Sequence, residues 1–393
     1  MPAQIGAAPP RPAGHKIPFM NGTHSNGCPP SFAEARTQRQ KARVAGLHPD
    51  YWYPVEYDHA LRRGRVIEVR FWNTSIALYR GDDGQLFAIE NRCAHRQLKL
   101  SLGHVDGCNL TCSYHGWSYD GSGKVVAIPH DLFGKSTLKV QLKSYPVQVR
   151  HGLIWIFPGD PRLAGERGIP DIPELEGKRP WPSVTIDFTW RAHHSMIFEN
   201  IIDFTHAYLH RSYRPFEGAK LLRSELAGDR LNLAYEVQVG RGRISGLFVD
   251  RQRVDTNSME LGIDYPYQWS NTGGKIKHWC FLLPIDERTS RAFFVFYFEA
   301  FQIPFTRLRL PHWLMRTFMG LARFFLIRPL LQQDGWAVEA EQEAFETHYD
   351  APLIEVNPVV GQFQQLAIRK WEEYLDKDGG ERRLQTADCG LQI

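Results

Sequence analysis

Short apolar runs separated by turn residues fill the chain between residues 51 and 161, and the apolar positions there do not repeat at helical spacing. Residues 75–79 and 86–90 are two such runs, and residues 82–84, Asp-Asp-Gly, lie between them. Asp-Gly readily takes the positive φ angles that tight hairpin turns require, so these runs predict a β-hairpin. The whole pattern predicts a compact antiparallel all-β module.

The pattern changes after residue 161, where the linker Pro-Gly-Asp-Pro at 158–161 marks a domain boundary. Residues 279–285 and 292–298 are aromatic-rich runs that predict core strands apolar on both faces. Residues 199–210 have a composition compatible with a helix. We therefore expect a second domain with both helices and strands over residues 162–393.

Composition limits the class of protein. The chain has 393 residues, of which 43% are hydrophobic and 23% are charged, so a collagen-like, wholly disordered or disulfide-stapled protein is excluded. A formal net charge of +4 gives no electrostatic reason to expect nucleic-acid binding. Six cysteines are too few for a secreted scaffold and are typical of a reducing compartment.

The first part of the chain has a different composition. Residues 1–47 are rich in Pro, Ala and Gly, and Glu34 is the single acid up to about residue 45. Such a segment cannot build a core, so we expect a disordered N-terminal arm, with an organelle-targeting peptide as the alternative. Neither a secretory signal pattern nor a run of 18 uncharged apolar residues occurs, so we expect a cytoplasmic protein.

The strongest chemical signal lies in the predicted all-β module. Cys93-Ala-His95 is followed by sixteen residues and then by Cys112-Ser-Tyr-His115. One thiolate and one imidazole from each of two loops suit a [2Fe–2S] cluster in which two Cys hold one iron and two His hold the other. A Cys2His2 zinc site is the alternative, but it usually groups the two Cys together and the two His together around a helix.

Together with His115-Gly116-Trp117, this pattern resembles the Rieske domain. The Rieske proteins of respiratory and photosynthetic complexes carry an extra Cys in each cluster loop, whereas this chain has Leu98 and Tyr114 at the matching positions. The resemblance therefore implies the lower-potential type found in oxygenases and their ferredoxins. It also implies that residues 48–161 form the Rieske domain.

A second group of metal-binding residues lies in the second domain. His206 and His210 are four residues apart, so on a helix both lie on one face and can converge on one ion. A facial triad of two His and one carboxylate leaves open iron positions for O₂ and substrate. Spacing alone does not identify the carboxylate.

Asn200-x-x-Asp203-x-x-His206 ahead of His210 resembles the catalytic motif of the terminal oxygenase (alpha) subunits of Rieske non-haem iron oxygenases. In that family the carboxylate lies over a hundred residues on in a C-terminal helix, and the resemblance assigns it to Asp334. The fold implied is α+β: a small all-β Rieske domain, then a helix-covered antiparallel-sheet (helix-grip, START-like) catalytic domain.

One departure from the family pattern concerns the second ligand. Family members usually separate the two His by four residues, whereas three separate His206 from His210. The alternative ligands are His193 and His194. The family role of Asp203 is to link the catalytic iron to the Rieske His of a neighbouring subunit in a head-to-tail homotrimer. A simpler role for Asp203 is to orient a ligand imidazole by hydrogen bonding.

The resemblance implies an enzyme that activates O₂ at a mononuclear Fe(II), with electrons delivered by the Rieske cluster. Because the sequence lacks a GxGxxG nucleotide fingerprint, we expect a separate NAD(P)H-dependent reductase, with or without a ferredoxin. The aromatic strands favour a bulky hydrophobic substrate, aromatic or polycyclic. Hydroxylation, cis-dihydroxylation, demethylation, desaturation and ring closure remain open. A pure Rieske electron carrier and a non-catalytic lipid or pigment carrier are the rival interpretations.

Residues 307–331 form a segment of mixed character. Leu, Phe, Trp and Met alternate there with five arginines, so the segment is too charged to span a membrane. It predicts either an ordinary helix that packs one face on the domain or a basic amphipathic helix that makes peripheral contact with a membrane surface. The five arginines are Arg307, Arg309, Arg316, Arg323 and Arg328.

Overall fold

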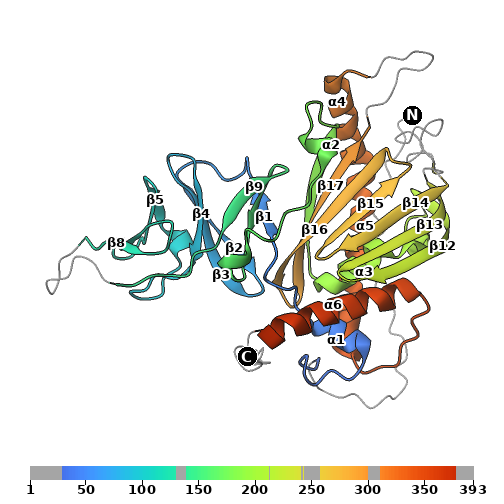
Figure 1. Cartoon of the computed structure of the whole chain (residues 1–393), viewed down its shortest axis with the longest axis horizontal. Helices are drawn as coiled ribbons and strands as arrows, with labels where there is room; N and C mark the ends of the chain where they lie inside the picture. Colours follow the sequence, from blue (N-terminus) through green and yellow to red (C-terminus); the bar gives the residue numbers. More distant parts are fainter. Residues whose placement is uncertain are drawn as a thin grey trace, which may run out of the picture.

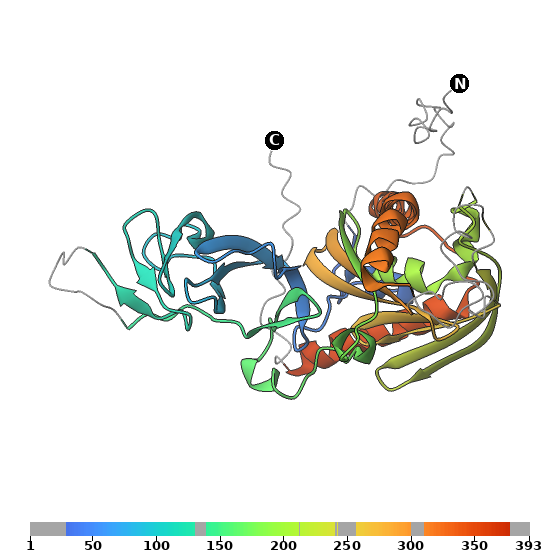
Figure 2. The ribbon, with the colours of Figure 1, turned by 90° about the horizontal axis from the view of Figure 1, so that it is seen from above.

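The computed structural model describes residues 29–129, 139–211, 213–239, 242, 257–299 and 310–377. Residues 1–28 of the predicted arm, and Arg307 and Arg309, lie outside this set. Both views place a smaller β lobe beside a larger domain built on a curved sheet (Figures 1 and 2). The predicted α+β class, a small β module followed by a helix-covered antiparallel sheet, is confirmed.

The smaller lobe, here called the cluster lobe, holds two sheets. The predicted hairpin is confirmed, since β3 pairs with β4 in antiparallel register and Gly84 takes a φ of +93° in the turn. A separate hydrophobic core, which includes Tyr79, Leu100 and Tyr119, lies within this lobe. The strands are β2 (Arg65–Phe71), β3 (Thr74–Arg80) and β4 (Leu86–Glu90), then β5 (His104–Asp106), β6 (Asn109–Thr111), β7 (Ser118–Tyr119) and β8 (Val125–Ala127), with a 3-10 turn at Leu100–Leu102.

A three-stranded sheet of order β1-β10-β9 joins the cluster lobe to the larger domain. The Trp155 ring packs edge-on against Phe281, with ring centroids 4.9 Å apart, and the strands share the core of the larger domain. The chain therefore enters and leaves the cluster lobe through adjacent strands. These strands are β1 (Tyr53–Tyr57), β9 (Val147–Arg150) and β10 (Leu153–Ile156).

The larger domain is built on a seven-stranded antiparallel sheet of order β11-β17-β16-β15-β14-β13-β12. The aromatic runs at 279–285 and 292–298 are strands, as predicted; they fall in β16 and β17, which pair with each other in antiparallel register. The strands are β11 (Ser183–Trp190), β12 (Phe216–Ala227), β13 (Arg230–Val239), β14 (Ser258–Asp264), β15 (Tyr267–Thr272), β16 (Ile276–Asp286) and β17 (Thr289–Phe298).

Helices cover one face of this sheet. Gly335 allows α5 to pack tightly on β11, because a Cβ atom at this position would lie 2.2 Å from Trp190 Nε1. The Tyr235 hydroxyl on β13 donates to the Ile202 carbonyl, which ties the sheet to α3. The helices are α2 (Pro173–Glu176), α3 (His194–Ile202), α4 (His312–Ala322), α5 (Arg328–His348) and α6 (Pro358–Lys377), with 3-10 turns at Pro161–Leu163 and Phe204–Tyr208 and a π-helix at Arg323–Ile327.

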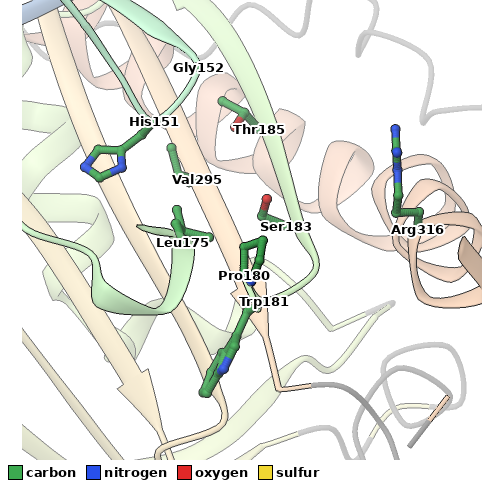
Figure 3. Close-up of a pocket in the computed structure, with 9 residues that line it drawn as sticks. All are labelled: His151, Gly152, Leu175, Pro180, Trp181, Ser183, Thr185, Val295 and Arg316. Carbon is green, nitrogen blue, oxygen red and sulfur yellow. The ribbon is translucent and has the colours of Figure 1, made fainter. Parts of the chain in front are cut away.

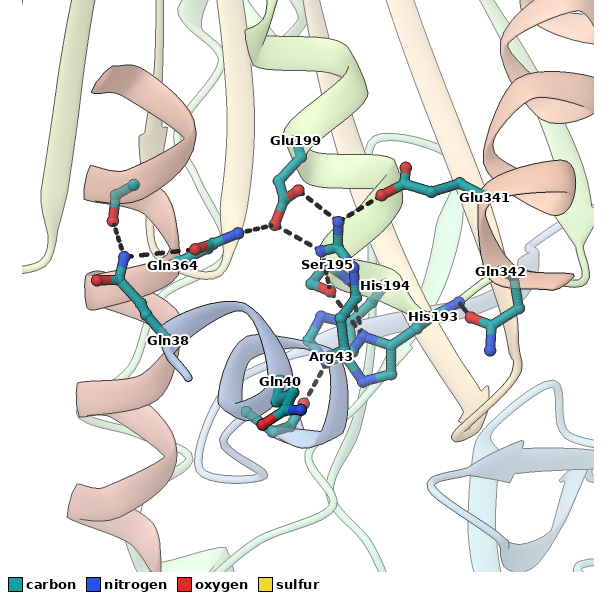
Figure 4. A network of polar contacts seen from close by, with 12 residues as sticks. Gln38, Gln40, Arg43, His193, His194, Ser195, Glu199, Glu341, Gln342 and Gln364 are labelled. Atoms are coloured by element: carbon teal, nitrogen blue, oxygen red, sulfur yellow. Dashed lines mark hydrogen bonds and ion pairs between the residues drawn. The ribbon is translucent and has the colours of Figure 1, made fainter. Parts of the chain in front are cut away.

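The prediction of a coreless arm over residues 1–47 is wrong for its last third. Helix α1 (Gln38–Val44) begins with a capping box at Thr37 and packs against α3 and α6. The Arg43 side chain reaches into the catalytic domain and pairs with Glu199 on α3 and Glu341 on α5 (Figure 4). A charged side chain that finds carboxylate partners can be buried without an apolar core of its own.

Within the described part of the chain, no helix is both long enough and apolar enough to cross a membrane.

Candidate metal and active site

Three side chains from two distant segments converge beneath the sheet. The potential ligand atoms of His206, His210 and Asp334 all lie within 4.8 Å of one another. Asp334 Oδ1 lies 3.1 Å from His210 Nε2 and 3.6 Å from His206 Nε2. The structure thus brings together the two His and the carboxylate that the sequence singled out.

The local backbone differs from the predicted continuous helix. Helix α3 ends at Ile202, Asp203 has extended φ and ψ of −94° and 98°, and a 3-10 turn follows over Phe204–Tyr208. The Asp203 side chain accepts a hydrogen bond from the Thr205 N–H and so caps the new turn. Short polar side chains favour such caps over helix interiors. His206 and His210 therefore lie in a tight turn and its exit.

Hydrogen bonds to the other ring nitrogens orient both imidazoles. His206 Nδ1 donates to the Asp203 carbonyl, and His210 Nδ1 donates to Gln333 Oε1 over 2.8 Å. With both Nδ1 atoms protonated, the Nε2 lone pairs are free to face Asp334. This arrangement is typical of metal-ligating His, whose second nitrogen usually donates to a carbonyl or carboxylate. Sequence reasoning missed Gln333, although its position next to Asp334 was a usable signal.

The electrostatics of the three groups favour a bound cation. Burial lowers the pKa of His206, which favours its neutral, ligating form. Burial also acts on His210, but the Asp334 carboxylate outweighs it and raises the pKa of His210, so a cation bound by both groups would take the place of the proton that the carboxylate attracts. Asp334 Oδ1 is buried and accepts no hydrogen bond from any described residue. A buried carboxylate oxygen without a donor, facing two imidazoles, fits a divalent iron site.

Aromatic rings form an apolar wall at this site. The Phe216 ring lies edge-on to both imidazoles, with centroid distances of 5.4 Å to His206 and 5.7 Å to His210. The ring of Phe204 packs against that of Phe216, with ring centroids 4.6 Å apart. Such a wall limits the access of water to the ligands and suits an apolar substrate.

The fallback ligands His193 and His194 have other partners. His193 Nδ1 hydrogen-bonds the Ser195 hydroxyl, and His194 Nε2 donates to the Ala45 carbonyl. Both rings lie in the Arg43 network of Figure 4, and neither belongs to the ligand group around Asp334. Burial lowers the pKa of each, so both are neutral structural side chains.

The carboxylate of Asp203 does not contact the ligand imidazole, since its backbone carbonyl makes that bond. Its Oδ1 accepts from Thr205 and from Asn357 Nδ2, the latter over 2.9 Å. Asn357 immediately precedes α6, so the end of α3 and the start of α6 meet at this carboxylate. Sequence reasoning missed Asn357, and its distance of 154 positions from Asp203 left no signal.

The four predicted cluster residues lie in two loops of the cluster lobe. Cys93 and Cys112 are buried and unbridged, and the rings of His95 and His115 lie 4.5 Å apart. The thiols point inward while His95 is exposed to solvent. Two thiols on one side and two imidazoles on the other match the ligand geometry of a Rieske cluster.

Aromatic residues hold these loops in place. The indole of Trp117 stacks on His95 with centroids 5.0 Å apart and planes 7° apart. The Tyr119 hydroxyl accepts from the Ala94 N–H, so its own proton is directed to Cys93 Sγ, 3.2 Å away. A hydrogen bond to a cluster thiolate raises the reduction potential of an iron–sulfur centre. Sequence reasoning missed Tyr119.

A cavity of about 420 Å³ lies elsewhere, between the turn at His151 and the catalytic domain. Trp181, Thr185 and Arg316 also line it, as Figure 3 shows. None of the seven candidate metal ligands lines this cavity. It is separate from the candidate iron site.

Comparisons with known proteins agree with this geometry. Residues 51–146 match the Rieske [2Fe-2S] domain, and residues 190–378 match the vanillate O-demethylase oxygenase C-terminal domain. The chain is 45% identical to the 4beta-methylsterol monooxygenase of Methylococcus capsulatus, over 86% of this chain and 92% of that protein. It is 31% identical to the chloroplastic chlorophyllide a oxygenase of Arabidopsis thaliana, over 44% of this chain and 32% of that protein.

Solved structures share the fold. Dicamba monooxygenase bound to 3,6-dichlorosalicylic acid superposes with a TM-score of 0.66 at 20% identity, over 86% of this chain and all of that chain. The Pseudomonas putida protein NdmA with caffeine gives a TM-score of 0.60 at 21% identity, over 88% of this chain and 95% of that chain. The relatives favour an oxygenase over a pure electron carrier or a non-catalytic carrier. The chain therefore belongs to the Rieske non-haem iron oxygenases, as a terminal oxygenase component with a [2Fe–2S] domain and a mononuclear-iron catalytic domain.

Proposed function

We propose that this oxygenase oxidises a methyl group on a bulky, largely apolar polycyclic substrate of the sterol class. The observation that carries the oxidation is the convergence of His206, His210 and Asp334 within 4.8 Å. The substrate class rests on the near full-length relative, a 4beta-methylsterol monooxygenase at 45% identity. The aromatic wall of Phe204 and Phe216 supports an apolar substrate.

The proposed ligands divide into two sets. Cys93 and Cys112 hold one iron of the [2Fe–2S] cluster, while His95 and His115 hold the other; His206, His210 and Asp334 hold the mononuclear Fe(II). When bound, these centres supply electron transfer and activation of O₂ for insertion into a C–H bond.

The chain's own side chains have three tasks around that chemistry. Gln333 and the Asp203 carbonyl keep both imidazoles in the Nδ1–H form and fix their planes. Phe204 and Phe216 exclude water from one side of the site. Tyr119 holds Cys93 through its hydroxyl. Each of these groups orients or desolvates a ligand, and none is consumed.

We further propose a head-to-tail homotrimer in which the cluster loops of one subunit dock beside Asp203 of the next. Leu102 and Tyr114 are large exposed apolar side chains beside the cluster ligands. Tyr208 and Ile354 are exposed near Asp203, since Ile354 lies three residues before its partner Asn357. Two exposed apolar surfaces, one at each end of the proposed electron path, support docking between copies.

The proposed electron source is a separate NAD(P)H-dependent reductase, which passes electrons to this chain directly or through a ferredoxin. The proposed location of both proteins is the cytoplasm. Relatives of this chain include the iron–sulfur subunits of the toluene-4-sulfonate monooxygenase system of Comamonas testosteroni, 34% and 32% identical over 40% and 45% of this chain. A subunit of a system depends on other components for electrons. The sequence has no nucleotide fingerprint of its own.

The test is iron content per chain after anaerobic reconstitution with Fe(II) and sulfide. Wild type should bind about three irons, and His206→Ala about two, since the cluster holds two of them. His348→Ala, an exposed His on α5, is the matched control and should keep three. Two irons in both wild type and His206→Ala would leave an electron carrier or a lipid carrier. The substrate is then tested with C4-methylated sterols, O₂ and a surrogate reductase, reading oxidised methyl products by mass spectrometry.

A further inference from the structure

Helix α4 and the π-helix that follows present apolar side chains on two opposite faces. Met315, Met319 and Ala322 are buried against the domain. At about 100° per residue these three positions form a single inner stripe. The segment therefore packs on the domain as an ordinary amphipathic helix would.

The outward stripe is unusual because it is mostly apolar; its polar member, Thr317, donates its hydroxyl proton to the Trp313 carbonyl. Trp313, Leu321 and Phe324 fall on the side opposite the inner stripe, and Trp313 and Phe324 are 69% and 66% exposed. A surface helix normally places charged or polar residues there. We call the outward residues the α4 face: Trp313, Leu314, Leu321, Phe324 and Phe325.

Arginines border this face and no acid accompanies them. The sequence has no Asp or Glu between Glu299 and Asp334. Arg316, Arg323 and Arg328 are exposed, and within the described ranges none of them forms an ion pair with a carboxylate, while the Arg328 guanidinium lies 5.8 Å from the centre of the Phe188 ring. An apolar aromatic stripe with a purely cationic border is complementary to a surface that is apolar beneath and negatively charged above.

We propose that the α4 face binds the surface of an anionic phospholipid bilayer. Trp and Phe side chains enter the acyl boundary while the arginines contact phosphate groups. A protein partner would need acidic residues to match the arginines and polar groups at its rim, and a second copy of this segment would bring arginines together. Figure 1 shows α4 at the opposite end of the catalytic domain from α1 and α6.

The α4 face and the candidate iron site lie on one continuous helical run. The π-helix continues into α5, and Phe324 lies ten residues before Asp334, about 15 Å along the helix. A sterol dissolved in the bilayer would thus leave the membrane close to the iron ligands. This consequence rests on the proposed function, whereas the binding of lipid does not.

The experiment is flotation of full-length protein with phosphatidylcholine vesicles that contain or lack phosphatidylglycerol. Wild type should float with anionic vesicles at low salt, and raising the salt should release it. Replacing both Trp313 and Phe324 by Ser should weaken binding at least tenfold, and Arg323→Gln about fivefold. Leu222→Ser and Arg62→Gln remove an exposed Leu and an exposed Arg elsewhere and should float like wild type.

Two results would overturn the proposal. Wild type that stays unbound to phosphatidylglycerol vesicles at low salt rules out lipid binding by this face. A double Ser variant that floats like wild type shows that binding lies elsewhere on the protein. If wild type binds no lipid and the double Ser variant has a different oligomer mass, the α4 face is a contact between subunits. Because flotation needs neither iron nor turnover, iron content per chain separates this failure from failure of the proposed function.

Discussion

Replacement of Arg43 by Met removes the charge that joins α1 to α3 and α5, the two helices next to the candidate iron ligands. Its guanidinium donates to Glu199 Oε2 over 2.6 Å, to Glu341 Oε1 over 2.7 Å and to the Ser195 hydroxyl over 2.9 Å. Arg43 and Glu199 are almost fully buried, whereas Glu341 is 40% exposed. Burial already raises the pKa of Glu199 despite the facing arginine.

The magnitude follows from the burial. Loss of one partner from a buried ion pair costs about 3–5 kcal/mol, because the other charge stays desolvated. The Glu341 contact adds less than about 1 kcal/mol, since that carboxylate reaches solvent. We expect Arg43→Met to lose about 3 kcal/mol or more of unfolding free energy. A second change, Glu199→Met, should recover most of the loss by removing the unpaired carboxylate.

The assay is urea unfolding at pH 7, followed by far-ultraviolet circular dichroism and by the visible absorbance of the cluster. The catalytic domain should unfold earlier in Arg43→Met while the cluster absorbance persists, because the cluster lobe has its own core. Arg36→Met, an exposed arginine just before α1, is the matched control. A loss below about 1 kcal/mol, or a double variant no more stable than Arg43→Met, would refute the reasoning.

Three further predictions concern the metal sites and acid stability. Gln333→Leu removes the acceptor that orients His210 and should weaken Fe(II) affinity about 10–100-fold, measured by anaerobic titration. Asp203→Ala should keep both metal centres but stop electron flow between them. When O₂ is added to the reduced variant, the cluster should then stay reduced. Burial lowers the pKa of His48 from 6.5 to about 4. As pH falls, the unfolded chain therefore takes up a proton at this imidazole before the folded chain does. The free energy of unfolding should fall between about pH 6.5 and about pH 4, by up to about 1.4 kcal/mol per pH unit. In His48→Phe the urea midpoint should depend less steeply on pH over this range.

Each of these predictions has its own control. Gln332→Leu, exposed on the same helix, should leave iron affinity unchanged, and equal losses in both variants would argue against orientation of His210. Near-normal single-turnover rates in Asp203→Ala would remove its role in electron transfer. An unchanged pH slope in His48→Phe would assign acid sensitivity to other groups.

The sequence predicted those features that depend on short-range patterns. Strands β16 and β17 followed from their aromatic runs, and the Asp-Gly turn at Gly84 followed from the φ preference of glycine. The four cluster residues could be predicted because both loops keep Cys and His two or three positions apart. In each case the residues that cooperate lie close together in the chain.

Features that depend on contacts between distant segments were missed or mistaken. Composition gave no hint that Arg43 would be buried, because its partners lie more than 150 positions away. The end of α3 depends on whether Asp203 caps a new turn or continues a helix, a choice that its distant contact with Asn357 helps to fix. Gln333 was overlooked because an orienting amide carries no charge pattern, and only its position next to Asp334 marked it.

The path of the chain through β1 and β10 makes the catalytic domain discontinuous in sequence. Helix α1 precedes the cluster lobe yet packs on the domain that follows it, so a fragment starting at residue 162 would lack Arg43 and Trp155. The Asp58 N–H donates to the Gly152 carbonyl over 3.0 Å, so the segment that contains the cluster lobe and β9 begins and ends at one point. A short turn joining these two residues would close β1 and β10 into a hairpin and would remove the cluster lobe together with β9, the edge strand of the joining sheet. The redox lobe is in this sense an exchangeable insertion, and lobes of different potential could be grafted at that point.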